Sequence, residues 1–208
     1  MAATLTAVLP LALSPSADGH ETVHDWVAQR DARLVEAALR EPDRFRELVV
    51  LHQDVVYATA YRLLGHDGDA HDVSQEAFLR AYRALGRFAD GRRFSPWICT
   101  ITANVARDLL RDPIRRWIGF TGAASERAAS RGSGPEEQLV AREQHDELGC
   151  ALRKLKPALR EVVVLRHVSG LSTNEVAQAL GISESAAKMR LKRGLDALEK
   201  LLPHAGSL

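Results

Sequence analysis

The C-terminal part of the chain carries a row of side chains that can bind nucleic acid. A helix is expected from Glu184 to about Leu202, and its inner face would pack on a domain through Ala187, Leu191, Leu195 and Leu198. Lys and Arg on the outer face can donate hydrogen bonds to base edges and neutralise phosphates. The pattern therefore favours a DNA-binding helix over a solvated basic face. The candidate contact residues are Ser185, Lys188, Met189, Arg190, Lys192 and Arg193.

A second group of residues suits binding to a protein. Asp72, Gln75, Glu76 and Leu79 recur at three- and four-residue steps, so a helix would carry them as one exposed stripe. A stripe that mixes acid, amide and apolar groups fits a basic helical partner. The alternative is an ordinary solvated helix face.

A third group suits unpaired DNA. Trp97, Thr100, Asn104, Arg107 and Arg111 would share one side of a helix. The loop before that helix runs from Phe88 to Phe94 and contains Arg92 and Arg93. An aromatic ring, an amide and arginines together can stack on, hydrogen-bond to and neutralise a single strand. Burial in a core would explain the aromatic residues, but it explains Asn104 and the arginine pair less well.

Helices must position all three groups. Ser172 and Glu175 form an S-x-x-E capping box before a short helix, and Gly181 marks its end. With the Glu184 helix they form a helix-turn-helix pattern. Two more helices are expected before it, over about 136–155 and from Pro157 to near Gly170. Towards the N-terminus, the apolar periodicity predicts helices over about 45–64 and 69–85, and one that begins with Ser95 as N-cap and ends at Asp112.

The segment between the two helical parts reads as a flexible linker. Residues 119–135 are rich in Gly, Ser and Ala and have no apolar periodicity. We therefore predict an all-α fold with two small domains, 22–118 and 136–204, that move independently. Residues 1–21 are expected to be a disordered tail.

Composition excludes several functions. The 208 residues have a net charge of +1, and the apolar stretch 5–13 is too short for a membrane span and has no basic residue before it. No phosphate-binding glycine loop, nucleophile elbow or His/Cys metal set occurs, and Cys99 and Cys150 lie far apart. We therefore expect a cytoplasmic protein that is not an enzyme, needs no cofactor or metal, and does not insert into a membrane.

Two long stretches resemble the extracytoplasmic-function sigma factors of the sigma-70 family. LLGHDGDAHDVSQEAFLRAYRALGRF, followed by FSPWICTITANVARDLLR, resembles their second region. LKPALREVVVLRHVSGLSTNEVAQALGISESAAKMRLKRGLDAL resembles their fourth region. Together the stretches cover well over half of the chain.

The resemblance implies a role for each group. Asp72, Gln75 and Glu76 match the D-x-x-Q-E motif that binds core RNA polymerase. Asn104 and the Arg92–Phe94 loop match the part that captures a flipped base of the minus-10 element. The basic helix matches the one that contacts the minus-35 element, through Lys188, Met189 and Lys192, with Arg190 and Arg193 on phosphates. A cognate anti-sigma factor is also implied.

The sequence departs from the family pattern at three positions. Ser74 replaces an aliphatic residue inside D-x-x-Q-E, while Met189 and Lys192 stand where other residue types are common. The last two leave the exact minus-35 sequence open.

Three other functions compete with this interpretation. A repressor or response-regulator output domain would share the helix-turn-helix, but it would not need the Asp72 stripe or the Asn104 face. An enzyme would need a catalytic motif. A sequestering protein would not need the basic helix.

Overall fold

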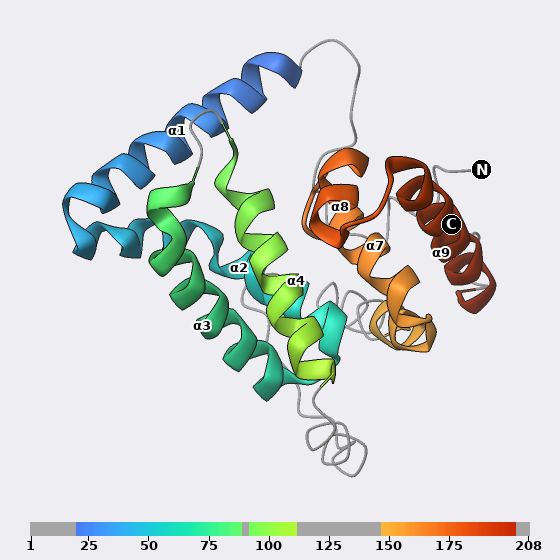
Figure 1. The fold of residues 1–208 in the computed structure, drawn as a ribbon. Helices are drawn as coiled ribbons and strands as arrows, with labels where there is room; N and C mark the ends of the chain where they lie inside the picture. Colours follow the sequence, from blue (N-terminus) through green and yellow to red (C-terminus); the bar gives the residue numbers. More distant parts are fainter. Residues whose placement is uncertain (1–19, 89–91, 112–146, 203–208) are drawn as a thin grey trace, which may run out of the picture.

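The computed structural model describes residues 20–88, 92–111 and 147–202, with side chains from Trp26 onward, and within these ranges the regular structure is helical. Figure 1 shows one group of helices built from α1 to α4 beside a second built from α7 to α9. This agrees with the all-α fold expected from the sequence. The predicted linker 119–135 and most of the predicted tail lie outside the described residues.

The first group packs around α2. Its elements are α1 (His20–Arg40), η1 (Pro42–Arg44), α2 (Phe45–Leu64), α3 (Asp67–Ala84), η2 (Leu85–Arg87) and α4 (Phe94–Arg111). Helices α2, α3 and α4 contact one another pairwise. The buried face of α3 consists of small side chains, which allow close helix packing: Ala70, Val73, Ala77 and Ala81.

Helix α1 was not predicted and begins inside the segment assigned to the tail. It packs on α2 and buries Asp31, Val35 and Ala38. These positions are four and three residues apart, which is helical spacing. A charged residue on the buried face weakened this pattern in the sequence.

Two predicted helix starts differ from the structure. Helix α3 begins at Asp67, two residues earlier than expected, after Gly65 adopts a left-handed conformation (φ 75°). Helix α4 begins at Phe94, so Ser95 lies inside the helix rather than at its N-cap. The carboxylate of Asp31 accepts a hydrogen bond from the Phe94 N–H (2.9 Å), and this long-range contact was not readable from local sequence.

The second group is the predicted helix-turn-helix with its supporting helix. Residues 147–154 are helical and are followed by α7 (Pro157–His167), α8 (Thr173–Leu180) and α9 (Glu184–Leu201). Ser172 and Glu175 form both hydrogen bonds of the capping box. Gly181 ends α8 at φ 63°, and Ser183 caps α9 by accepting from the Ala186 N–H. The local prediction for this motif is confirmed.

The two groups are in direct contact. Helix α7 packs against α2 and α4. The Arg160 guanidinium donates to the carbonyl oxygen of Leu63 (2.8 Å), and the hydroxyls of Thr59 and Ser169 lie 2.9 Å apart in a buried position. The structure thus holds one packed arrangement of the halves, whereas the sequence predicted independent movement.

Candidate functional site

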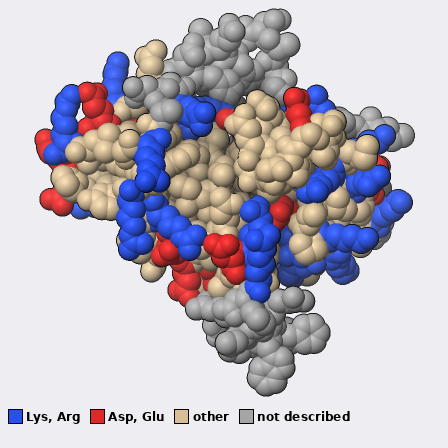
Figure 2. Space-filling model, in the orientation of Figure 1, with Lys and Arg blue, Asp and Glu red and all other residues tan. Residues whose placement is uncertain are grey.

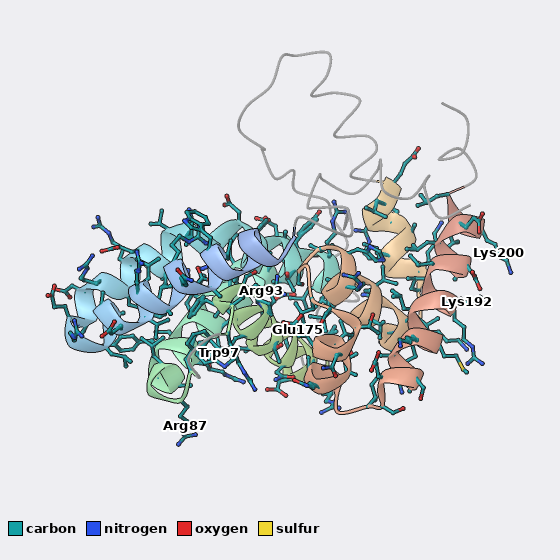
Figure 3. All side chains as sticks on the ribbon, turned by 90° about the horizontal axis from the view of Figure 1, so that it is seen from above. Arg87, Arg93, Trp97, Glu175, Lys192 and Lys200 are labelled. Atoms are coloured by element: carbon teal, nitrogen blue, oxygen red, sulfur yellow. The ribbon has the colours of Figure 1, made fainter. Side chains whose placement is uncertain are left out.

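The outer face of α9 is an exposed row of donor side chains. Ser185, Lys188, Met189, Lys192 and Arg193 are exposed, and Arg190 is half-buried. On the inner face Ala187 and Leu198 are buried, while Leu191 and Leu195 are partly buried. Lys188 pairs along its own helix, with Glu184 at 2.7 Å. Figure 3 shows Lys192 and Lys200 pointing away from the rest of the protein. This helix can therefore enter a groove without unfolding its own domain.

The charge distribution agrees with this arrangement. Figure 2 shows Lys and Arg gathered over α9, with acidic side chains sparse there. Lys and Arg also lie over the α3–α4 part of the same view, where acidic side chains stand beside them. Because the net charge is only +1, the basic cluster over α9 is a local feature and not the result of a basic protein overall.

The predicted stripe on α3 lies beside a groove between α3 and α4. Asp72, Gln75 and Leu79 are exposed and Glu76 is half-buried. The groove is lined by Asp72, Val73, Glu76, Arg80, Val105, Asp108 and Leu109. Arg80 donates to Glu76 (2.8 Å) and to Asp108 (3.2 Å), so it ties the stripe to α4. Sequence reasoning missed Arg80, although its four-residue spacing from Glu76 was a signal for an ion pair.

The polar side of α4 is a connected cluster. Arg107 donates to the Asn104 side-chain oxygen (2.9 Å) and, through Nε, to Glu161 of α7 (3.0 Å). The Thr100 hydroxyl donates back to the Pro96 carbonyl oxygen, and Arg111 is exposed at the end of the helix. Asn104 and Arg107 are thus together, as predicted, but α7 covers part of them.

The aromatic residues before and within α4 pack on one another. Trp97 lies edge-to-face on Phe88 and Phe94, with ring centroids 5.2 and 5.4 Å away. The Phe94 ring is fully buried, so it is not open to a base in this conformation. Trp97 is partly buried. For these rings the packing interpretation describes the observed contacts better than stacking on DNA.

The two arginines of the loop have different environments. Arg92 is exposed, whereas Arg93 points toward Glu175 at the start of α8 (Figure 3). The Arg93 Nη2 atom lies 3.2 and 3.3 Å from the two carboxylate oxygens. Burial raises the pKa of Glu175, but hydrogen bonds from Ser172 and the charge of Arg93 outweigh it and leave the pKa lowered. The pairing of Glu161 and Glu175 with this face was not predicted, although Glu175 was expected in the capping box, because the two partners lie 54 and 82 residues away.

Comparison with known proteins assigns both halves of the chain. Residues 48–117 match the family model described as sigma-70 region 2, and residues 145–198 match sigma-70 region 4. The chain is 36% identical over 160 residues to the RNA polymerase sigma factor CarQ of Myxococcus xanthus, across 77% of this chain and 90% of CarQ. The chain is an ECF sigma factor of the sigma-70 family.

Other relatives agree with this assignment. The sigma factor is 30% identical over 177 residues to the ECF RNA polymerase sigma factor SigW of Bacillus subtilis, across 82% of this chain and 95% of SigW. A solved structure of CnrH in complex with the cytosolic domain of CnrY matches with a TM-score of 0.61 and 28% identity, across 83% of this chain and 97% of that one.

The identification fixes the general activity of the sigma factor. It associates with core RNA polymerase and directs promoter-specific initiation of transcription, with DNA-binding in region 4. Region 2 contains the α3 stripe and the α4 cluster, and region 4 contains α7 to α9. None of the described helices is both long and apolar enough to cross a bilayer. Among the described side chains, no three His, Cys, Asp or Glu residues are grouped as metal ligands would be.

Proposed function

We propose that the three surfaces divide the work of initiation between them. The α3 stripe of Asp72, Gln75, Glu76 and Leu79 binds core polymerase. The outer face of α9 reads the minus-35 element, while the α4 cluster with Arg92 and Arg93 captures the melted minus-10 strand. The factor recognises the promoter and assists its melting, while the polymerase synthesises RNA in the cytoplasm. This chain therefore needs no catalytic site.

One observation supports the minus-10 assignment most strongly. Two arginines of this face, Arg93 and Arg107, each meet a carboxylate from region 4, at 3.2 and 3.0 Å. Arginine forks bind carboxylates and phosphates with the same donors. A surface that accepts anions from its own chain is suited to the phosphates of a single strand.

Asn104 is the candidate for holding an unstacked base. Its amide can both donate to and accept from a base edge. In the packed arrangement its oxygen accepts from Arg107. Binding of DNA here requires region 4 to move off α4, because Glu161 occupies the other side of Arg107.

The test is open-complex formation by an Asn104→Ala variant in the holoenzyme. Extruding a base costs a few kcal/mol, so loss of its holder should sharply reduce permanganate reactivity of promoter thymines. Affinity for core and for a minus-35 duplex should stay close to that of the wild type. A promoter already mismatched across the minus-10 element should recover part of the loss. Equal opening of duplex promoters by the variant and the wild type would remove the melting role.

A cognate anti-sigma factor is the further partner that we propose. The support is the likeness to CnrH, whose structure has been solved in complex with the cytosolic domain of CnrY. A candidate anti-sigma protein should block run-off transcription by this factor and not by an unrelated one.

A further inference from the structure

Asp31 is a buried carboxylate that belongs to none of the three proposed binding surfaces. It lies on α1, its side chain has no exposed area, and it is the one acid among the fully buried described residues. Taking a carboxylate out of water is costly unless it is hydrogen-bonded or paired. The contacts of the Asp31 carboxylate therefore indicate which part of the fold it stabilises.

Asp31 joins the first residue of α4 to side chains of α1 and α2. One oxygen accepts the Phe94 backbone N–H at 2.9 Å. The other accepts from Arg30 (3.0 Å) and lies 3.7 Å from the His52 Nε2 atom on α2. Burial raises the pKa of Asp31, but the interactions with His52, Phe94 and Arg30 outweigh it and leave the pKa lowered. A charged acceptor is thus held at the N-terminus of α4, where backbone N–H groups lack helical partners.

The same position is fixed from its other sides by aromatic contacts. The Phe94 ring packs on His52 at 5.0 Å and on Phe88 at 5.8 Å between centroids. Phe88 and Phe94 are the two ends of the loop that carries Arg92 and Arg93. Arg93 is bonded directly to Phe94, so its backbone position follows from where Phe94 is held.

We infer that Asp31 is a positioning residue for promoter melting, which sets the start of α4 and thereby the placement of Arg92 and Arg93. This inference rests on the proposed minus-10 role of the α4 face. Asp31 has no exposed area, so in this arrangement its side chain is out of reach of DNA. Its part is preorganisation, because a loop whose end is already fixed loses less conformational freedom when it binds.

The experiment compares Asp31→Asn with Asp31→Leu in the full-length holoenzyme. The two side chains are uncharged and similar in size, but only Asn keeps an oxygen that can accept the Phe94 N–H. Removing one partner of a buried ionic group is destabilising, so the folded fraction of each variant is measured by circular dichroism and promoter opening is compared per folded molecule. We expect Asp31→Leu to reduce permanganate reactivity of a duplex promoter at least tenfold. Asp31→Asn should stay within threefold of the wild type, and both variants should keep core and minus-35 affinity within twofold.

A matched control addresses general loss of stability. Val35→Ala removes buried packing on the same helix, one turn away from Asp31. If the Asp31→Leu variant fails to fold, Asp31→Ala is compared with Val35→Ala at temperatures where equal fractions are folded. A larger melting defect for Asp31→Ala supports positioning, whereas equal defects overturn it.

The outcomes separate this inference from the proposed function. Duplex promoters opened normally by a folded Asp31→Leu variant would overturn the positioning role. If Asn104→Ala still lowers opening in the same assay, the minus-10 role of α4 stands and only the role of Asp31 falls. If neither Asp31→Leu nor Asn104→Ala affects promoter opening, the proposed minus-10 role of the α4 face fails as well.

Discussion

Lys188 and Arg193 are both exposed on α9, yet they point in different directions. They are five residues apart, which corresponds to about 140° around a helix at roughly 100° per residue. Lys188 lies near the N-terminal end beside Glu184, and Arg193 lies beyond the middle of the helix. Two cations on one helix can therefore serve base edges and phosphates separately.

Substitution of each cation should separate these roles. Lys188→Ala should cost on the order of 1–3 kcal/mol at the preferred minus-35 site and relax sequence preference. Arg193→Ala should weaken all sequences alike and lower the salt slope by about one. Binding isotherms on specific and scrambled duplexes over a series of salt concentrations measure both effects. Equal loss on both duplexes for Lys188→Ala would contradict its assignment to base edges.

The double change Gln75→Ala with Glu76→Ala tests the protein-binding stripe. Both side chains reach solvent, so the fold should persist by circular dichroism. Affinity for core polymerase should fall roughly tenfold, which is about 1.4 kcal/mol. Fluorescence anisotropy of the labelled factor titrated with core measures this. Glu36→Ala is the matched control, since Glu36 is an exposed acid on α1 that pairs with Arg40.

At the scale of elements, close packing on α7 fixes the position of α9, the helix proposed to read the minus-35 element. Gly194 is buried in the middle of α9, where glycine lowers helix stability by roughly 1 kcal/mol relative to alanine. A Cβ atom at this position would lie 2.7 Å from Val163 Cγ2 and 3.4 Å from the Leu159 carbonyl oxygen. Glycine is needed here because the two helices approach closely.

Gly194→Ala should therefore destabilise region 4 despite the better helix propensity of alanine. Overpacking of this kind costs about 1–3 kcal/mol. Chemical denaturation should show an earlier transition, and minus-35 affinity should fall because α9 is displaced. Gly86→Ala is the control, since a Cβ there meets nothing within 4 Å. Unchanged stability for Gly194→Ala would mean that α7 and α9 separate at little cost.

At the scale of the whole molecule, the interface between the halves includes polar contacts, and some of these are made by residues proposed to meet DNA. Glu161 and Glu175 pair with Arg107 and Arg93, and Thr59 meets Ser169. Cys99 is buried beside this last pair, with its sulfur 3.7 Å from the Thr59 hydroxyl. Burial raises the pKa of Cys99 to about 11, which keeps the thiol protonated and slow to react. Its reactivity can report how often the halves separate.

Neutralising the two acids should favour separation. Partly exposed ion pairs contribute about 0.2–1 kcal/mol each. Glu161→Gln with Glu175→Gln should thus speed Cys99 labelling roughly fivefold, the equivalent of about 1 kcal/mol. Gln also preserves the capping box of α8, so the helix-turn-helix should remain intact. The background is Cys150→Ser, because Cys150 is exposed.

The same double variant should bind single-stranded minus-10 DNA more tightly than the wild type. Glu199→Gln serves as the control, since Glu199 is an exposed acid on α9, a helix that packs on α7 and α8. An unchanged labelling rate would show that the acids do not hold the halves together.

The sequence alone determined the features that depend on neighbours within about four residues. The capping box, the left-handed Gly181 and the outer row of α9 were all predicted, because their hydrogen bonds and helix faces lie within one or two turns. The exposed stripe on α3 followed from the same periodicity. The resemblance to the sigma factors depended on these local patterns in the right order.

Only the tertiary structure decided which polar side chains are covered and which residues cover them. Asp31 meets Phe94 across 63 positions, Arg107 meets Glu161 across 54, and Arg93 meets Glu175 across 82. Such pairs depend on how whole helices pack, and one-dimensional periodicity does not contain that geometry. For the same reason the sequence did not decide whether Phe94 and Trp97 pack in the core or bind DNA. The packing of α1 to α4 placed their rings against each other.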